Sequence, residues 1–170
     1  MLRACGKRGT NVNPGKQFEK DIKDSVPKSV YYLRLHDSAI GFDKEHSTQR
    51  FALKSPYDAV LCRNGQMICM ELKSTKDRSI SFDGVSPMIK PEQLIALHNA
   101  SEIGGATAGL ILNFRAHEKT FWMDIGVFEE FQRVTTKKSI SVDDAENYGR
   151  RIPSKRLRVH NRYDLSVLWD

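Results

Sequence analysis

The sequence contains few cysteines, and their spacing suggests neither disulfide bonds nor a metal site. The three cysteines, Cys5, Cys62 and Cys69, are an odd number and form no Cys-x-x-Cys pair. Disulfide frameworks are typical of secreted domains, whereas isolated reduced thiols are typical of proteins inside the cell. We therefore expect free thiols, with Cys62 and Cys69 in the core, in a cytoplasmic protein.

The sequence also lacks long apolar runs and clustered histidines. No segment approaches the ~20 apolar residues of a membrane span, and the N-terminus has no apolar run of signal-peptide length. We therefore expect no membrane partner. The five histidines show no HxH or HExxH spacing, which argues against zinc. A serine or cysteine triad cannot be assembled from the sequence either.

Acidic residues are missing from one strongly basic stretch near the C-terminus. The 170-residue chain has a formal net charge of +6, and residues 150–162 contain six Lys/Arg and no Asp or Glu. A basic excess of this kind favours a polyanionic partner, although such a run is more often a solvated face. We interpret it as a track for the phosphate backbone of DNA, formed by Arg150, Arg151, Lys155 and Arg156.

The length and residue patterns predict one domain over residues 13–170, preceded by a flexible basic arm over residues 1–12. Residues 37–54 show no clean period and suggest a short excursion. Elsewhere the patterns alternate in the order helix, strands, helix, strands, helices. This order predicts an α/β fold with a central mixed sheet flanked by helices.

One stretch places charges on strands that should be buried. Residues 56–73, PYDAVLCRNGQMICMELK, contain two apolar runs around an Asn-Gly pair, which is the signal of a type I′ hairpin turn. Extending the register outward from the turn puts Asp58 opposite Glu71, with their Cβ atoms roughly 5 Å apart. Lys73 lies two residues beyond Glu71, so it points to the same face.

Two opposed carboxylates repel each other, and a divalent cation between them would remove that repulsion. Oxygen ligands suit Mg²⁺, for which Mn²⁺ could substitute, so Asp58 and Glu71 are candidate metal ligands. Such an ion lowers the pKa of a bound water and clamps a phosphate, while Lys73 stabilises transition-state charge. The alternative interpretation is an Asp58–Lys73 salt bridge at the end of the sheet, with Glu71 solvated.

With these residues in view, the chain resembles the PD-(D/E)xK nuclease superfamily, and more closely the RecU family of Holliday-junction resolvases. The resemblance runs from about Gly15 to Leu168 and implies a restriction-endonuclease-like fold. The segment GKQFEKDI resembles the family's first helix and implies a metal-site role for Glu19. The segments YDAV and MELKST resemble the catalytic hairpin, and SFDGVSPMIKPEQLIAL implies a catalytic role for Gln93.

The chain departs from the family pattern at two places. Pro14-Gly15-Lys16 stands where the family usually has an Arg-Gly before the first-helix Glu, and we expect Lys16 to contact phosphate. Residues 37–54 occupy the place of a longer stalk in the family, which bears on junction selectivity. After Lys73, we expect phosphate or metal-shell contacts from Ser74 and Thr75, for which the alternative is a strand-end cap, and we expect Lys76 to contact DNA.

The resemblance implies a Mg²⁺-dependent endonuclease that cuts four-way DNA junctions and leaves 3′-hydroxyl and 5′-phosphate ends. Paired cuts on a two-fold junction need two sites, so we expect a homodimer with isologous contacts. A host cell would be bacterial, with the gene encoded by the bacterium or by a phage. The alternatives are a nuclease of the same fold for duplex, flap or other branched DNA, a non-catalytic DNA-binding protein, or a protein-interaction module.

Overall fold

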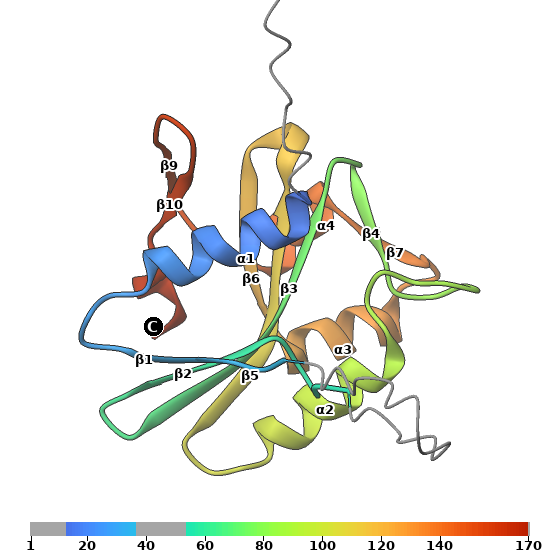
Figure 1. Ribbon diagram of the computed structural model, residues 1–170. Helices are drawn as coiled ribbons and strands as arrows, with labels where there is room; N and C mark the ends of the chain where they lie inside the picture. The colour runs from blue at the N-terminus through green and yellow to red at the C-terminus, as the bar shows by residue number, and fades with distance from the viewer. Residues whose placement is uncertain (1–12, 37–53, 170) are drawn as a thin grey trace, which may run out of the picture.

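The structure is a computed structural model that describes residues 13–36 and 54–169 (Figure 1). The expected arm over residues 1–12 and all but the last residue of the expected excursion over 37–54 lie outside the described residues. The helices are α1 (Pro14–Ser25), α2 (Pro91–Ser101), α3 (Ile125–Val134) and α4 (Val142–Tyr148), with 3₁₀ turns η1 (Arg115–His117) and η2 (Leu165–Leu168). The strands are β1 (Tyr31–Arg34), β2 (Ala59–Arg63), β3 (Gln66–Thr75), β4 (Ser79–Ser81), β5 (Ala106–Phe114), β6 (Lys119–Asp124), β7 (Ser139–Ser141), β8 (Arg150–Arg151), β9 (Ser154–Arg156) and β10 (Asn161–Tyr163).

A mixed sheet forms the centre of the fold, with strand order β1-β2-β3-β5-β6-β8. The long strands β3 and β5 run parallel, and the other neighbouring strands in this sheet are antiparallel. Two small antiparallel pairs, β4 with β7 and β9 with β10, lie outside it. The predicted α/β class with a central mixed sheet is therefore confirmed.

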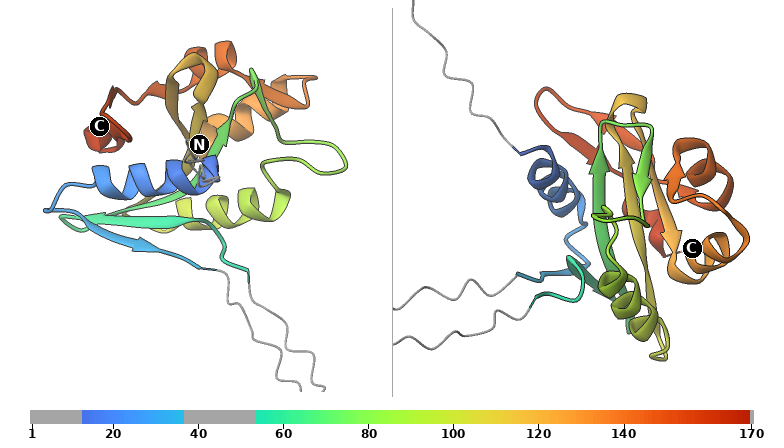
Figure 2. Two further views of the ribbon diagram at one scale, coloured as in Figure 1. Left: turned by 45° about the horizontal axis from the view of Figure 1, so that its top comes forward. Right: turned by 90° about the vertical axis from the view of Figure 1, so that its right-hand side faces the viewer.

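Helices cover both faces of the sheet. The helix α1 lies on one face, while α3 and α4 lie on the other (Figure 2). Phe18 and Ile22 on α1 are buried against a core that includes Leu72 and Ile111. The opposite core contains Leu97 of α2 together with residues of α3 and α4. This two-faced burial explains why β3 and β5 are apolar on both sides.

The start of α1 follows the sequence signals. Asn13 caps the helix, because its Oδ1 accepts a hydrogen bond from the N–H of Gly15 at 2.9 Å, and Pro14 occupies the first helical position. Phe18 and Ile22 form the buried stripe predicted from their spacing. The cap and the stripe together set the direction in which α1 crosses the sheet.

The β2–β3 hairpin has the predicted turn and register. Asn64 and Gly65 both have positive φ, as a type I′ turn requires, and Arg63 pairs with Gln66. The paired segment ends at Ala59 with Met70. Asp58 is the next residue, and its N–H donates to the carbonyl of Met70 at 3.1 Å. The hairpin thus brings Asp58 beside the position of Glu71.

The basic run near the C-terminus folds into short strands that the sequence pattern did not indicate. Strand β8 joins the sheet next to β6, and the β9–β10 hairpin lies beside α1 (Figure 1). The N–H of Asn161 donates to Asp21 Oδ2 at 3.0 Å, and the N–H of Tyr163 donates to Ser25 Oγ at 2.9 Å. The C-terminal part is therefore anchored on the first helix.

Candidate active site

The predicted catalytic residues approach one another from three parts of the fold. Glu19 of α1, Asp58 before β2, Glu71 of β3 and Gln93 of α2 line one cavity of about 300 Å³. Asp58 stands where the chain enters β2, and Glu71 lies near the middle of the long strand β3. A site residue on α1 and one on α2 are thus brought together with the hairpin.

Glu71 and Lys73 form a direct ion pair on β3. Their side chains point to the same face, and Lys73 Nζ lies 2.8 Å from Glu71 Oε1. The Glu71 residue is only 2% exposed, and the side chain of Lys73 is 14% exposed. The lysine therefore carries its charge on β3 directly beside Glu71, which borders the cavity. The alternative of a solvated Glu71 is excluded by this burial.

Gln93 links the two charged side chains. Its Nε2 donates to Glu71 Oε1 at 2.5 Å, and its Oε1 accepts from Lys73 Nζ at 3.0 Å. The same Oε1 accepts from the N–H of Lys90 at 3.0 Å, which ties Gln93 to the beginning of α2. Gln93 thus restricts the orientation of both side chains on β3.

Asp58 is held against β3 by its own side chain. Its Oδ2 accepts a hydrogen bond from the N–H of Leu72 at 2.8 Å. Leu72 lies between Glu71 and Lys73, so the carboxylate of Asp58 is fixed beside both. The Asp58–Lys73 salt bridge considered from the sequence is not formed, because Lys73 pairs with Glu71.

Burial and a neighbouring negative charge both disfavour the ionised form of Glu71. Burial raises the pKa of Glu71 to about 7, and the negative charge of Asp58 is the next cause, while Lys73 acts in the opposite direction. Oε1 is occupied by Lys73 and Gln93. Oε2 is buried and has no hydrogen-bond partner among the described residues. A divalent cation between Asp58 and Glu71 fits this arrangement, because it would pair the free oxygen and offset the repulsion.

Glu19 lies at the other side of the cavity, paired with Arg34 of β1. Burial raises the pKa of Glu19, the charge of Arg34 lowers it, and the charge of Asp58 raises it. Within residues 13–36 and 54–169, no group of three or more His, Cys, Asp or Glu side chains is arranged to hold a metal ion. The role of Glu19 as a metal ligand therefore stays a prediction.

Sequence reasoning missed Arg34. It ends β1, which pairs with β2 so that Arg34 lies opposite Ala59, the neighbour of Asp58. No local signal could have placed it there, because residues 35–58 separate the two positions in the chain. Only a correct pairing of β1 with β2 would have shown that an arginine borders the carboxylates.

The residues predicted to contact phosphate differ in their surroundings. Lys16 lies close enough to Glu19 to lower the pKa of its carboxyl. Ser74 Oγ instead donates to Asn113 Oδ1 at 2.8 Å, and Thr75 is buried. Lys76 is exposed just past β3. Their contacts with DNA stay predictions.

The basic residues near the C-terminus do not lie at this cavity. Arg150 and Arg151 are exposed on β8, and Lys155 and Arg156 are exposed on β9. Arg151 and Arg156 border a second cavity, which Glu19 does not border. Their role on DNA also stays a prediction.

The fold defines the class of protein. A mixed sheet whose central hairpin carries Asp58, Glu71 and Lys73, with Glu19 on the first helix, has the architecture of the PD-(D/E)xK, restriction-endonuclease-like proteins. The family model described as Recombination protein U matches residues 13–163. The chain belongs to this RecU family.

Two known proteins illustrate the relationship. The chain is 29% identical over 170 aligned positions to the SPbeta prophage-derived uncharacterized protein YotM of Bacillus subtilis (strain 168), covering 92% of this chain and 85% of that protein. The structure is similar to that of Hjc, a Holliday junction resolvase of Archaeoglobus fulgidus, with a TM-score of 0.51 and 15% identity. That match covers 81% of this chain and 95% of Hjc and supports the fold.

None of the helices in the described part of the chain is both long and apolar enough to cross a membrane.

Proposed function

We propose that the protein is a Mg²⁺-dependent endonuclease that resolves four-way DNA junctions by paired hydrolysis of phosphodiester bonds. The observation that carries the proposal is the group formed by the buried Glu71 and the partly buried Asp58 and Lys73 in a member of the RecU family. A fold would not place two facing carboxylates in a sheet for stability alone, because their repulsion opposes folding.

The metal site would be formed by Asp58 and Glu71, with Glu19 joining them on release from Arg34. A bound Mg²⁺, or Mn²⁺ in its place, would stabilise charge on the phosphate and lower the pKa of a coordinated water. Glu71 contributes its buried Oε2, and the hydrogen bond from Leu72 holds the carboxylate of Asp58 in place. Glu71 therefore has one oxygen that is free for a cation among the described residues.

Lys73 and Gln93 act on the reacting phosphate and its surroundings. The ammonium group of Lys73 lies 2.8 Å from Glu71, which borders the cavity, and it would stabilise the negative charge that develops on the phosphate oxygens. Gln93 orients Lys73 and Glu71 through its two hydrogen bonds. The orientation is set before substrate binds, which reduces the reorganisation needed during reaction.

The proposal also covers the DNA contacts, the oligomeric state and the cellular location of the protein. Basic side chains at Lys16 and along β8 and β9 would contact the DNA backbone outside the catalytic cavity. Two cuts on a two-fold symmetric junction need two such sites, so the active form would be a homodimer. The protein would act in the cytoplasm of a bacterial host, encoded by the bacterium or by a phage.

The test compares a labelled four-way junction with linear duplex of the same sequence during a Mg²⁺ titration. We expect cleavage of the junction that requires Mg²⁺ or Mn²⁺ and stops in EDTA, with much slower cleavage of the duplex. Equal cleavage of both substrates would contradict junction resolution and favour a duplex nuclease of the same fold. DNA binding without cleavage under any metal condition would contradict the enzyme.

A further inference from the structure

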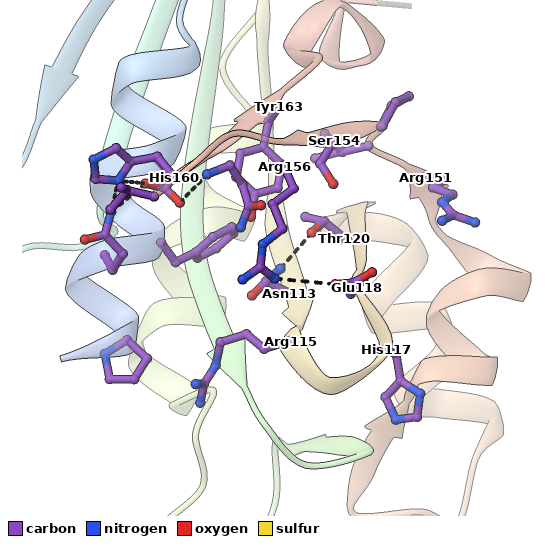
Figure 3. A pocket seen from close by; sticks show the side chains of 18 residues that line it. Asn113, Arg115, His117, Glu118, Thr120, Arg151, Ser154, Arg156, His160 and Tyr163 are labelled. Carbon is purple, nitrogen blue, oxygen red and sulfur yellow. Dashed lines mark hydrogen bonds and ion pairs between the residues drawn. The ribbon is translucent and has the colours of Figure 1, made fainter. Parts of the chain in front are cut away.

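A second and larger cavity lies between α1 and the C-terminal strands (Figure 3). It has a volume of about 690 Å³ and is bordered by the beginning of α1, the β5–β6 turn, β8 and the β9–β10 hairpin. None of the residues that border it also borders the cavity of Asp58 and Glu71. The cavity is therefore not used by the proposed catalytic group.

Three arginines from separate elements surround this cavity. They are Arg115 of η1, Arg151 of β8 and Arg156 of β9. Within the described residues, neither Arg115 nor Arg151 has an ion-pair partner. Arg156 Nη1 lies 3.6 Å from Glu118 Oε1, and both side chains are largely exposed, so this pair is weak. Figure 3 shows the pair as a dashed line beside Asn113.

The beginning of α1 adds further positive potential. Pro14 and Gln17 border the cavity, and the first turn of this 12-residue helix contains no acidic residue. The dipole of a helix favours anions near its N-terminus, and here the dipole acts without the N–H of Gly15, which already donates to Asn13 Oδ1. The dipole and the arginines come from separate elements, and both favour a negatively charged ligand.

The two acidic residues at the cavity do not cancel this preference. Asp21 is buried, and its oxygens accept hydrogen bonds from Gln17 Nε2 at 2.6 Å and from the N–H of Asn161 at 3.0 Å. Its charge therefore serves to fasten β10 to α1. Glu118 is exposed at the turn and engages only Arg156 among the described residues. A ligand that binds Arg156 would displace it.

The floor of the cavity is connected to the strand of Lys73. Asn113 and Thr120 border the cavity, and Asn113 Nδ2 donates to Thr120 Oγ1 at 2.8 Å. Ser74 Oγ donates to Asn113 Oδ1 at 2.8 Å, and Ser74 follows Lys73 on β3. Side-chain hydrogen bonds thus link the cavity to the strand that carries the catalytic lysine.

We propose that this cavity binds a phosphate of the DNA backbone, in a segment of substrate away from the cleaved bond. The inference rests on the proposed function and adds to it a specific anchoring site. The guanidinium group is planar and matches two phosphate oxygens at once, which a site built from several arginines exploits. Anchoring there would fix one strand relative to β3 and hence to Lys73.

The experiment measures binding of fluorescent duplex and junction DNA by anisotropy, in Ca²⁺ and in EDTA, across a series of NaCl concentrations. The variants are Arg115→Ala, Arg151→Ala and Glu118→Gln. The control is Arg133→Ala, which removes an exposed arginine of α3 on the opposite side of the sheet from α1. Thermal unfolding of each variant checks folding, and Arg115→Gln or Arg151→Gln replaces the alanine variant at the same position if that variant unfolds.

We expect each cavity arginine variant to bind about 5- to 10-fold more weakly than wild type and to lower the slope of log K against log salt by about 1. Glu118→Gln should bind about 2- to 3-fold more tightly, because it removes a competing negative charge. A purely structural role for the turn would not tighten binding. The control should stay within about 2-fold of wild type.

Two outcomes would overturn the inference. One is binding by Arg115→Ala and Arg151→Ala equal to that of Arg133→Ala, and the other is weaker binding by Glu118→Gln. The proposed function fails by a different result, because it requires metal-dependent cleavage by the wild-type protein. Loss of affinity in the arginine variants without any wild-type cleavage would support the anchoring site and reject the nuclease.

Discussion

At the scale of single residues, the surroundings of Glu71 shift its pKa in opposite directions. Burial and the charge of Asp58 favour its protonated form, while Lys73 favours its ionised form. Its pKa is raised to about 7, close to the pH at which cells work. The ionised form that would bind a metal is therefore the form that the metal-free protein tolerates least.

This conflict predicts a pH-dependent stability without metal. The pKa of Glu71 is higher in the folded protein than in the unfolded chain, so its stabilising contribution is complete below about pH 4.5 and is lost as the pH rises through about 7. In EDTA, Glu71→Gln should therefore gain stability relative to wild type between pH 5 and pH 8.5, on the order of 3 kcal/mol. Urea unfolding at both pH values measures the gain.

The matched control for that measurement is Glu102→Gln, because Glu102 is an exposed glutamate just past α2. Its stability difference from wild type should change little between the two pH values. An equally small stability difference between Glu71→Gln and wild type at pH 5 and at pH 8.5 would contradict the raised pKa of Glu71.

At the scale of elements, the site depends on β3, which β5 supports from one side. Glu71 pairs with Leu110 in the parallel ladder of these strands. Gly109 is the preceding residue of β5, and a Cβ there would collide with the carbonyl oxygen of Met123 and lie 2.7 Å from the Trp122 ring. The absence of a side chain at Gly109 thus permits the close contact of β5 with β6.

Gly109→Ala should therefore destabilise the fold by roughly 2 to 3 kcal/mol through overpacking, measured by chemical unfolding. Gly104→Ala is the control, because a Cβ at Gly104 would meet nothing within 4 Å. We expect the control to change stability by less than about 0.5 kcal/mol. Equal stability of the two variants would contradict the tight packing of β5 against β6 at Gly109.

The elements differ in how far the sequence predicts them. Asn64-Gly65 is a local signal with one dominant geometry, so the register of β2 and β3 follows from it. Strands β8, β9 and β10 are two or three residues long and polar, and they therefore leave no periodic pattern. Their positions depend on contacts with α1 and β6, which lie far away in the sequence.

In the candidate site too, residues close together in the sequence could be predicted, whereas residues far apart in the sequence could not. Asp58, Glu71 and Lys73 could be predicted because one hairpin carries them. Gln93 lies 20 residues beyond Lys73, and only the resemblance to RecU proteins pointed to it. Arg34 required the pairing of β1 with β2, and the second cavity required four separate segments to meet.

At the scale of the whole molecule, the two cavities divide the proposed tasks. In the proposal, Asp58 and Glu71 of one cavity would take part in hydrolysis, and Arg115 and Arg151 of the other would hold DNA. Ser74 donates to Asn113, and Asn113 donates to Thr120, so hydrogen bonds connect the second cavity to the strand that carries Glu71 and Lys73. This division predicts that cleavage and binding can be lost separately.

The most direct test of the central claim is therefore Lys73→Ala, assayed for junction cleavage in Mg²⁺ and for junction binding in Ca²⁺. Removing the ammonium group should slow cleavage at least about 100-fold, because it stabilises charge only during reaction, and should leave affinity within about 2-fold of wild type. Lys138→Ala, at an exposed lysine paired with Asp83, should change neither quantity by more than about 2-fold. Cleavage by Lys73→Ala at the wild-type rate would contradict the assignment of this site.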